Sequence, residues 1–255
     1  MNVYLMPTMA CQLMCSHCYA RRFPYRHNVT KEPEEWARVL SPLLGNGWLR
    51  LVGREPSGYP GLRDLLAAVE CDHISIDTNL MIQPWSWLHD VFAHKVKLIN
   101  AGLQYHPDDP QSGVFWEHIK WLRSYHQHMK LNVVNVLYQY DLPSQVEVVN
   151  RRAANAGEGI NVIHHPFSPR YMSKSVRFRD SVAECACGTS SLFVLPDGTA
   201  HRCAARAISD ATPVGNIFDQ LVLGESACSE VCCADSDMAR WSRGEGDDYV
   251  DIFGS

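Results

Sequence analysis

Three cysteines stand close together near the start of the chain, at Cys11, Cys15 and Cys18. Thiolates are preferred ligands of zinc and of iron-sulfur clusters, so a C-x3-C-x2-C spacing indicates a metal site. Structural zinc sites use four closed ligands, whereas three cysteines on one short loop can hold three irons of a [4Fe-4S] cluster and leave the fourth iron open to a small molecule. We therefore expect a cluster with one open iron. Zinc, with His17 or a distant residue as the fourth ligand, is the alternative, and a disulfide framework for the ten cysteines is a weaker one.

Strand-like and helix-like segments alternate over the first two thirds of the chain, starting with an apolar strand directly before the cysteines. Strands are expected at Val3–Thr8, Trp48–Val52, His73–Asp77, Val96–Ala101, Lys130–Tyr138 and Ile160–His165. Helices are expected between them, at Thr30–Leu44, Gly61–Glu70, Ser86–Ala93, Val114–His128 and Pro143–Ala156. This alternation predicts parallel βα units with right-handed crossovers. The pattern alone allows an open doubly wound sheet or a partial barrel.

Polar residues follow several of these strands, where the carboxyl ends of parallel strands would meet. The most specific segment is Gly53-Arg54-Glu55-Pro56, directly after the second strand. An ordinary surface turn would also explain it. Further candidates at strand ends are Asp77–Asn79, Gln104–His106, Asn132, Asn135, His164 and His165. For each of these a structural hydrogen bond is the alternative to a ligand contact.

Six more cysteines occupy the tail. A Leu192–Cys203 segment with Pro-Asp-Gly at its centre predicts a β-hairpin, which would bring Cys187 and Cys203 toward each other. Four thiolates from this region could close a second metal site, and zinc is the alternative to iron and sulfur there. The candidates are Cys185, Cys187, Cys203, Cys228, Cys232 and Cys233. Cys71, far from both groups, is expected to be a small buried apolar residue.

The cysteine triplet and the Gly53–Pro56 segment resemble the motifs of the radical S-adenosylmethionine (SAM) superfamily. The resemblance implies an α/β fold, a (β/α)6 partial TIM-type barrel, with the cluster on the loop after the first strand. It implies that SAM chelates the open iron and is cleaved reductively to a 5′-deoxyadenosyl radical. It also implies SAM contacts from Gly53 and Glu55, from His17 beside the adenine, and from Gln104 and Asn135 on later strands. Arg54 departs from the family pattern, which has a second glycine there.

The tail resembles the auxiliary-cluster domains called SPASM and Twitch, through Cys187, the Gly198-x4-Cys203 spacing and Gly215-Asn-Ile217. The resemblance implies two domains, a barrel at 1–167 and a small cysteine-rich domain at 168–255. It implies one auxiliary [4Fe-4S] cluster, since six tail cysteines fall short of the seven in the full SPASM pattern. Its ligands would be Cys187 and Cys203 with two of Cys228, Cys232 and Cys233. Cys185 could substitute, donate a hydrogen atom or have no role.

We therefore expect a radical SAM enzyme that abstracts a substrate hydrogen and oxidises or cross-links a peptide or small natural product. An epimerase with Cys185 as hydrogen donor, and a non-catalytic iron-sulfur or zinc redox sensor, are the alternatives. An external electron donor such as flavodoxin or ferredoxin is implied as a partner. The net charge of −5 disfavours a nucleic-acid substrate, and without a long apolar run we expect a cytoplasmic protein with no membrane partner.

Overall fold

The computed structural model describes residues 1–15, 18, 29–81, 94–103, 110–137, 142–166, 191–208 and 212–223 of the chain. Its helices are α1 (Pro33–Leu44), the short 3-10 turn η2 (Pro56–Gly58), α2 (Leu62–Ala68), α3 (Pro110–Tyr125), α4 (Leu142–Ala156) and α5 (Ala204–Ile208). Its strands are β1 (Asn2–Leu5), β2 (Leu49–Leu51), β3 (Ile74–Thr78), β4 (Val96–Leu103), β5 (Lys130–Leu137), β6 (Ile160–Pro166), β7 (Ser191–Val194), β8 (Thr199–His201) and β9 (Gly215–Asn216).

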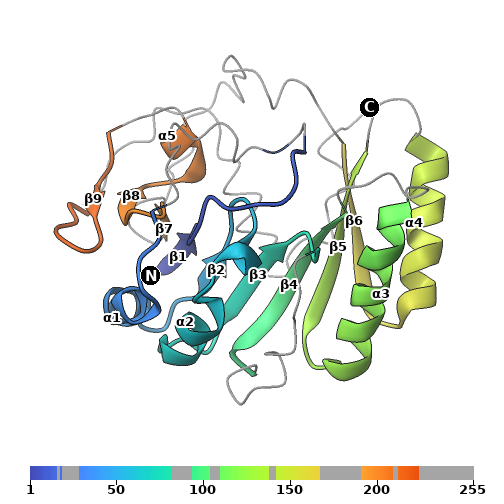
Figure 1. The fold of residues 1–255 in the computed structure, drawn as a ribbon, viewed down its shortest axis with the longest axis horizontal. Helices are drawn as coiled ribbons and strands as arrows, with labels where there is room; N and C mark the ends of the chain where they lie inside the picture. Colours follow the sequence, from blue (N-terminus) through green and yellow to red (C-terminus); the bar gives the residue numbers. More distant parts are fainter. Residues whose placement is uncertain are drawn as a thin grey trace.

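These strands form one sheet in the order β6-β5-β4-β3-β2-β1-β7-β8-β9. Strands β1 to β6 are all parallel, and each pairs with its neighbour in sequence, as repeated βα units require. The six predicted strands are confirmed, and the mostly parallel α/β sheet agrees with the predicted fold class. Figure 1 shows α1 and α2 beside the first strands and α3 and α4 beside β5 and β6. The carboxyl ends of β1 to β6 consequently share one edge of the sheet.

Alternating residues of each strand enter different cores, because successive side chains of a strand point to opposite faces. In β1, Val3 and Leu5 lie in the core that contains Trp36 and Leu65 of the covering helices. Tyr4 lies in a second, smaller core on the other face, together with Phe193 of β7. We call the first the helix-covered face and the second the inner face. This distinction determines which strand residues can line the interior of a partial barrel.

The helices begin and end for identifiable local reasons. Helix α1 starts at Pro33, whose missing N–H costs nothing in the first turn, and Glu35 accepts the backbone N–H of Glu32 at 3.2 Å. Helix α3 likewise starts at a proline, Pro110, four residues before the predicted Val114. The ammonium of Lys95 donates to three carbonyls at the end of α2, including that of Val69 at 2.8 Å. None of the described helices is long and apolar enough to cross a membrane. The helix predicted at Ser86–Ala93 lies outside the described residues.

The predicted tail hairpin forms as β7 and β8, which are antiparallel. Strand β7 in turn pairs in parallel with β1, in register from Asn2 with Ser191 to Leu5 with Val194. The sheet therefore continues across the boundary that we expect between 167 and 168. This pairing places the hairpin directly beside the strand that leads into the cysteine loop.

The inner face carries a row of polar side chains, one from each of β2 to β6. Arg50 donates to Asp77 from Nε and Nη2, with the shortest contact at 2.9 Å. Asn100 also donates to Asp77, at 2.7 Å. The amide of Asn132 donates to Asn100 at 2.8 Å and that of Asn161 to Asn132 at 3.3 Å. The side-chain N–H2 groups of these three asparagines therefore all point along the row in the direction of Asp77. Their hydrogen bonds fix the side chains of the row on the inner face.

Candidate metal centre at the carboxyl-terminal edge of the sheet

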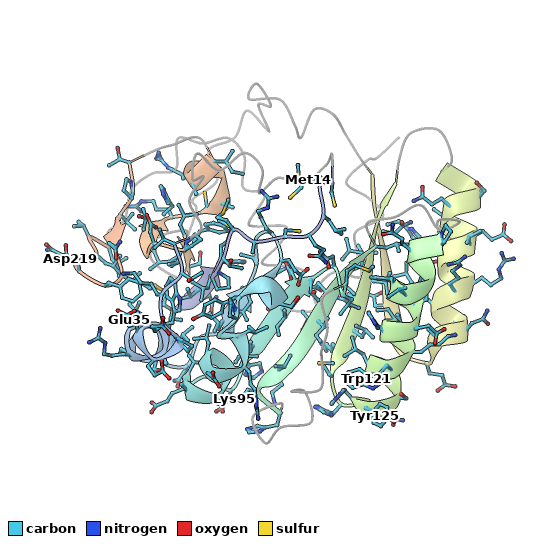
Figure 2. The ribbon with its side chains drawn as sticks, in the orientation of Figure 1. Met14, Glu35, Lys95, Trp121, Tyr125 and Asp219 are labelled. Atoms are coloured by element: carbon cyan, nitrogen blue, oxygen red, sulfur yellow. The ribbon has the colours of Figure 1, made fainter. Side chains whose placement is uncertain are left out.

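The three cysteines of the triplet lie on the loop that follows β1, at the carboxyl-terminal edge of the sheet. Figure 2 shows Met14 of this loop on the side opposite Lys95, which directly precedes the start of β4. The backbone N–H of Cys18 donates to the carbonyl of Cys15 at 3.3 Å, so the C-x2-C pair closes a turn. All three thiols are partly exposed, and none is in a disulfide. The position predicted for the cluster-binding loop agrees with this placement.

The sulfur of Cys11 accepts two hydrogen bonds. One comes from the backbone N–H of Leu13 at 3.4 Å, and the other from the side-chain amide of Asn79, on the loop after β3, at 3.8 Å. Burial raises the pKa of the Cys11 thiol, and the Leu13 N–H and the positive charge of Arg54 act in the opposite direction. Donors aimed at a sulfur stabilise negative charge on it, which a metal-bound thiolate carries.

Within the described part of the chain, no three His, Cys, Asp or Glu side chains converge on a point where one metal ion would bind. A [4Fe-4S] cluster takes each thiolate on a different iron, so its ligands need not share such a point. The triplet supplies three thiols on one loop, a closed turn at Cys15 and Cys18, and N–H donors at Cys11. Its donor set fits a cluster.

Gly53 and Arg54 occupy the loop after β2, next to the cysteine loop. Gly53 has φ of 109°, and a Cβ there would lie 2.4 Å from Cγ of Met6, so only glycine fits this close approach. Among the described non-glycine residues, Leu80 alone has a positive φ, so the backbone at Arg54 accepts a side chain without strain. This accounts for an arginine where the family has its second glycine. The Nε of Arg54 is buried and has no hydrogen-bond partner among the described residues.

The carboxylate of Glu55 is completely buried and connects the loops after β2 and β3. It accepts the backbone N–H and the hydroxyl of Ser57, at 3.2 and 2.6 Å. It also accepts the hydroxyl of Thr78 and the backbone N–H of Asn79, both at 2.7 Å. Burial raises the pKa of Glu55, and these hydrogen bonds oppose the increase. With both oxygens engaged, Glu55 holds the loop in place, and a contact of its side chain with SAM stays a prediction.

Asn135 lies on the helix-covered face rather than the inner face. Its amide oxygen accepts from Gln145 of α4 at 3.1 Å, and its amide nitrogen lies 3.1 Å from Nδ1 of His164. His164 is in turn 2.9 Å from the side chain of Asn150 on α4. Asn135 is thus engaged in a structural network, and the predicted SAM contact gains no support from its position. The other strand-end candidate on β5, Asn132, faces the inner side.

Cys203 is buried between β8 and α5. Helix α5 packs through Ala204 and Ala207 on the inner-face core that includes Met6, and Cys18 packs against the same core. Helix α5, which belongs to the predicted auxiliary region 168–255, is thereby brought next to the cysteine loop. The other predicted site residues lie outside the described residues, namely His17, Gln104, Cys185, Cys187, Cys228, Cys232 and Cys233.

Sequence reasoning gave no specific role to Asn79, which joins these loops, or to Arg50 of the inner-face row. Asn79 stood only in a strand-end segment, and Arg50 was only part of an apolar run. The available signal at Arg50 was a charged residue between Leu49 and Leu51 in a short strand. The positive φ of Leu80 could not be predicted, because glycine and not leucine is the residue usually found in that conformation.

No protein-family model matches the chain, and no curated protein matches it. Solved structures do. SuiB of Streptococcus suis, bound to the precursor peptide SuiA, superposes with a TM-score of 0.58 and 16% identity over 90% of this chain and 65% of SuiB. Native anSMEcpe with AdoMet and the Cp18Cys peptide gives 0.58 and 12%, over 87% and 78%. BtrN with AdoMet and 2-DOIA gives 0.53 and 12%, over 86% and 79%.

These similar structures are radical SAM enzymes, and at such low identities the likeness establishes the fold. The chain has the radical SAM fold, which confirms the fold predicted from the cysteine motif and the strand-helix alternation. It spans just under two thirds of the length of SuiB.

Proposed function

We propose that the chain is a radical SAM enzyme that binds a [4Fe-4S] cluster through Cys11, Cys15 and Cys18 and cleaves SAM reductively. The observation that carries the proposal is the position of the triplet. It lies at the carboxyl-terminal edge of a parallel sheet of this fold, beside the Gly53–Glu55 segment and joined to it through Asn79. These contacts support a single site built from two motifs that are separate in sequence.

Each part of the site has a definable task. When bound, the cluster supplies the electron that cleaves SAM to a 5′-deoxyadenosyl radical, which abstracts a hydrogen from the substrate. Gly53 lets the backbone of its loop approach closely, and Glu55 fixes that loop to Thr78 and Asn79. The inner-face row from Arg50 to Asn161 gives the interior a polar lining suited to hydrogen-bonding a substrate or SAM.

For the substrate we propose a peptide or a small natural product that is oxidised or cross-linked. The support is the molecules bound by proteins of the same fold, a precursor peptide in SuiB, a Cp18Cys peptide in anSMEcpe and 2-DOIA in BtrN. An auxiliary [4Fe-4S] cluster on Cys187, Cys203 and two of Cys228, Cys232 and Cys233 would take up the electron left on the substrate. Flavodoxin or ferredoxin would reduce the first cluster, in the reducing cytoplasm.

Anaerobic reconstitution with iron and sulfide, followed by addition of dithionite and SAM, tests the proposal. We expect 5′-deoxyadenosine by liquid chromatography and mass spectrometry, and its loss in Cys15→Ala. The matched control is Cys71→Ala, because Cys71 is buried away from the loop and bonds to the carbonyl of His73. A protein that binds iron and sulfide but forms no 5′-deoxyadenosine would instead be the redox sensor.

Iron content separately tests the auxiliary cluster. We expect more than four irons per chain, and a loss of about four in Cys203→Ala on the basis of one cubane cluster. An iron content for one cluster, unchanged by that substitution, would exclude the second. Formation of an epimerised product, abolished in Cys185→Ala while 5′-deoxyadenosine persists, would establish epimerisation instead of oxidation.

A further inference from the structure

Asn79 bonds to both loops of the proposed site. Its backbone N–H donates to Glu55 at 2.7 Å, and its amide nitrogen is 3.8 Å from the sulfur of Cys11. The side chain is buried. No motif assigned it a role, although its side chain donates to a cysteine sulfur of the triplet.

The orientation of the Asn79 amide follows from its other contacts. Its oxygen accepts the backbone N–H of Met81 and the side-chain amide of Gln12, both at 2.9 Å. An amide turned the other way would place two N–H donors against its own N–H2 group. The nitrogen must therefore face Cys11. Gln12 belongs to the cysteine loop itself, so the loop contributes to the alignment of its own donor.

The backbone around Asn79 is also held in an unfavourable conformation. Leu80, the next residue, has φ of 58°, which costs a branched side chain about 1 kcal/mol or more. Its N–H donates to the Thr78 hydroxyl at 3.0 Å, and its carbonyl contacts the His118 ring. Such a conformation persists only where surrounding contacts enforce it. Here they hold the turn that presents Asn79 to the cysteine loop.

We propose that Asn79 is a positioning residue of the cluster, and that its N–H bond to the Cys11 sulfur raises the cluster's reduction potential. The inference rests on the proposed function, since it assumes a cluster on Cys11. Reduction adds negative charge to the cluster and its sulfurs, and a fixed N–H donor stabilises that charge. Without the donor, the one-electron reduction becomes less favourable.

An anaerobic redox titration of the reconstituted protein without SAM, followed by electron paramagnetic resonance, measures this effect. In Asn79→Asp the oxygen that accepts from Gln12 and Met81 is kept, while the donor becomes an acceptor facing the sulfur. We expect reduction to become at least tenfold less favourable, about 59 mV more negative for a one-electron couple. Asn79→Ala removes the donor without adding charge, so its shift is expected to be smaller and in the same direction.

Asn46→Asp is the matched control, because it adds the same charge at an exposed position in the turn between α1 and β2, which precedes β2 and so lies at the edge of the sheet opposite to the cysteine loop. Its potential is expected to equal that of the unmodified protein. Gln12→Ala, at an exposed position, removes one of the two donors that orient Asn79 and is expected to shift the potential partway. Because the titration contains no SAM, it measures the reduction potential whether or not the protein cleaves SAM. Unchanged potentials in Asn79→Ala and Gln12→Ala at normal iron content would overturn the inference.

Discussion

The buried carboxylate of Glu55 accepts the backbone N–H of Asn79 at 2.7 Å, and this bond joins the loop after β2 to the loop after β3. Three further donors from Ser57 and Thr78 complete its shell. Glu55→Gln replaces one acceptor oxygen by an N–H2 group that must face donors. We expect the free energy of unfolding in urea to fall by about 2 kcal/mol, as for a lost hydrogen bond to a charged group.

Glu34→Gln is the control for Glu55→Gln, since Glu34 is exposed in the first turn of α1. Its unfolding free energy is expected to change by less than about 0.5 kcal/mol. Equal midpoints for the two variants would show that the four bonds to Glu55 contribute nothing to stability.

Gly53→Ala tests the close approach between the loops after β1 and β2. The added Cβ would meet Met6, and the φ of 109° disfavours any side chain. We expect a loss of about 2 kcal/mol in unfolding free energy from overpacking and backbone strain together, and a lower iron content after reconstitution. Urea denaturation and an iron assay measure the two effects.

Arg54→Ala is the comparison for Gly53→Ala, because the backbone at Arg54 needs no glycine and the Arg54 Nε makes no hydrogen bond to the described residues that the substitution would remove. Its unfolding midpoint is expected to stay close to that of the unmodified protein. A Gly53→Ala variant as stable as Arg54→Ala would contradict the steric argument.

Much of the fold could be predicted because its signals are local. Apolar runs and helical spacing identified the six parallel strands, and Pro33 and the acids after it marked the start of α1. The pairing of β7 with β1 was not predictable in the same way. Its register joins Asn2 to Ser191, residues nearly the whole described chain apart, and no local pattern specifies such a partner.

The site could be predicted where a sequence motif specifies metal ligands. It could not be predicted where the role of a residue depends on which face of a strand carries its side chain. The triplet placed Cys11 on the loop after β1 correctly, because motif and strand are adjacent in sequence. Asn135 and Asn132 are both polar residues of β5, and only an odd or even position separates the helix-covered face from the inner face. Asn79 and Glu55 meet only in the folded chain, so their bond left no pattern in the sequence.

Asp77→Asn tests the ion pair on the inner face. Arg50 is 1% exposed and Asp77 is 27% exposed, and their contacts reach 2.9 Å. Asp77→Asn removes the negative charge beside a buried guanidinium, and its single amide oxygen cannot replace both of the carboxylate oxygens that Arg50 and Asn100 use. We expect the free energy of unfolding to fall by about 3 kcal/mol, measured by urea denaturation.

The control for Asp77→Asn is Glu117→Gln, which breaks the exposed pair of Glu117 with Lys120 at 2.8 Å on α3. An exposed pair at this spacing contributes about 0.3 kcal/mol, so the loss should be near the error of the measurement. The burial of the guanidinium is the difference between the two pairs. Similar losses of unfolding free energy in both variants would mean that the burial of Arg50 does not make its ion pair with Asp77 more important for stability.

His164 predicts a dependence of stability on pH. Burial lowers its pKa from the usual 6.5, because the charged ring is less well solvated in the folded chain. The neutral ring accepts from Asn135 at Nδ1 and donates to Asn150 from Nε2, and a proton on Nδ1 would face the Asn135 N–H2 group.

As the pH falls below about 6.5, the unfolded chain takes up this proton before the folded chain does, so the His164 contribution is fully present above that pH and is lost progressively below it. The slope for one proton is at most about 1.4 kcal/mol per pH unit. His164→Gln cannot titrate but can still donate to Asn150. Urea denaturation between pH 5 and 8 should therefore show a smaller fall in stability for His164→Gln than for the unmodified protein. Parallel curves for the two proteins would assign the acid sensitivity to other groups.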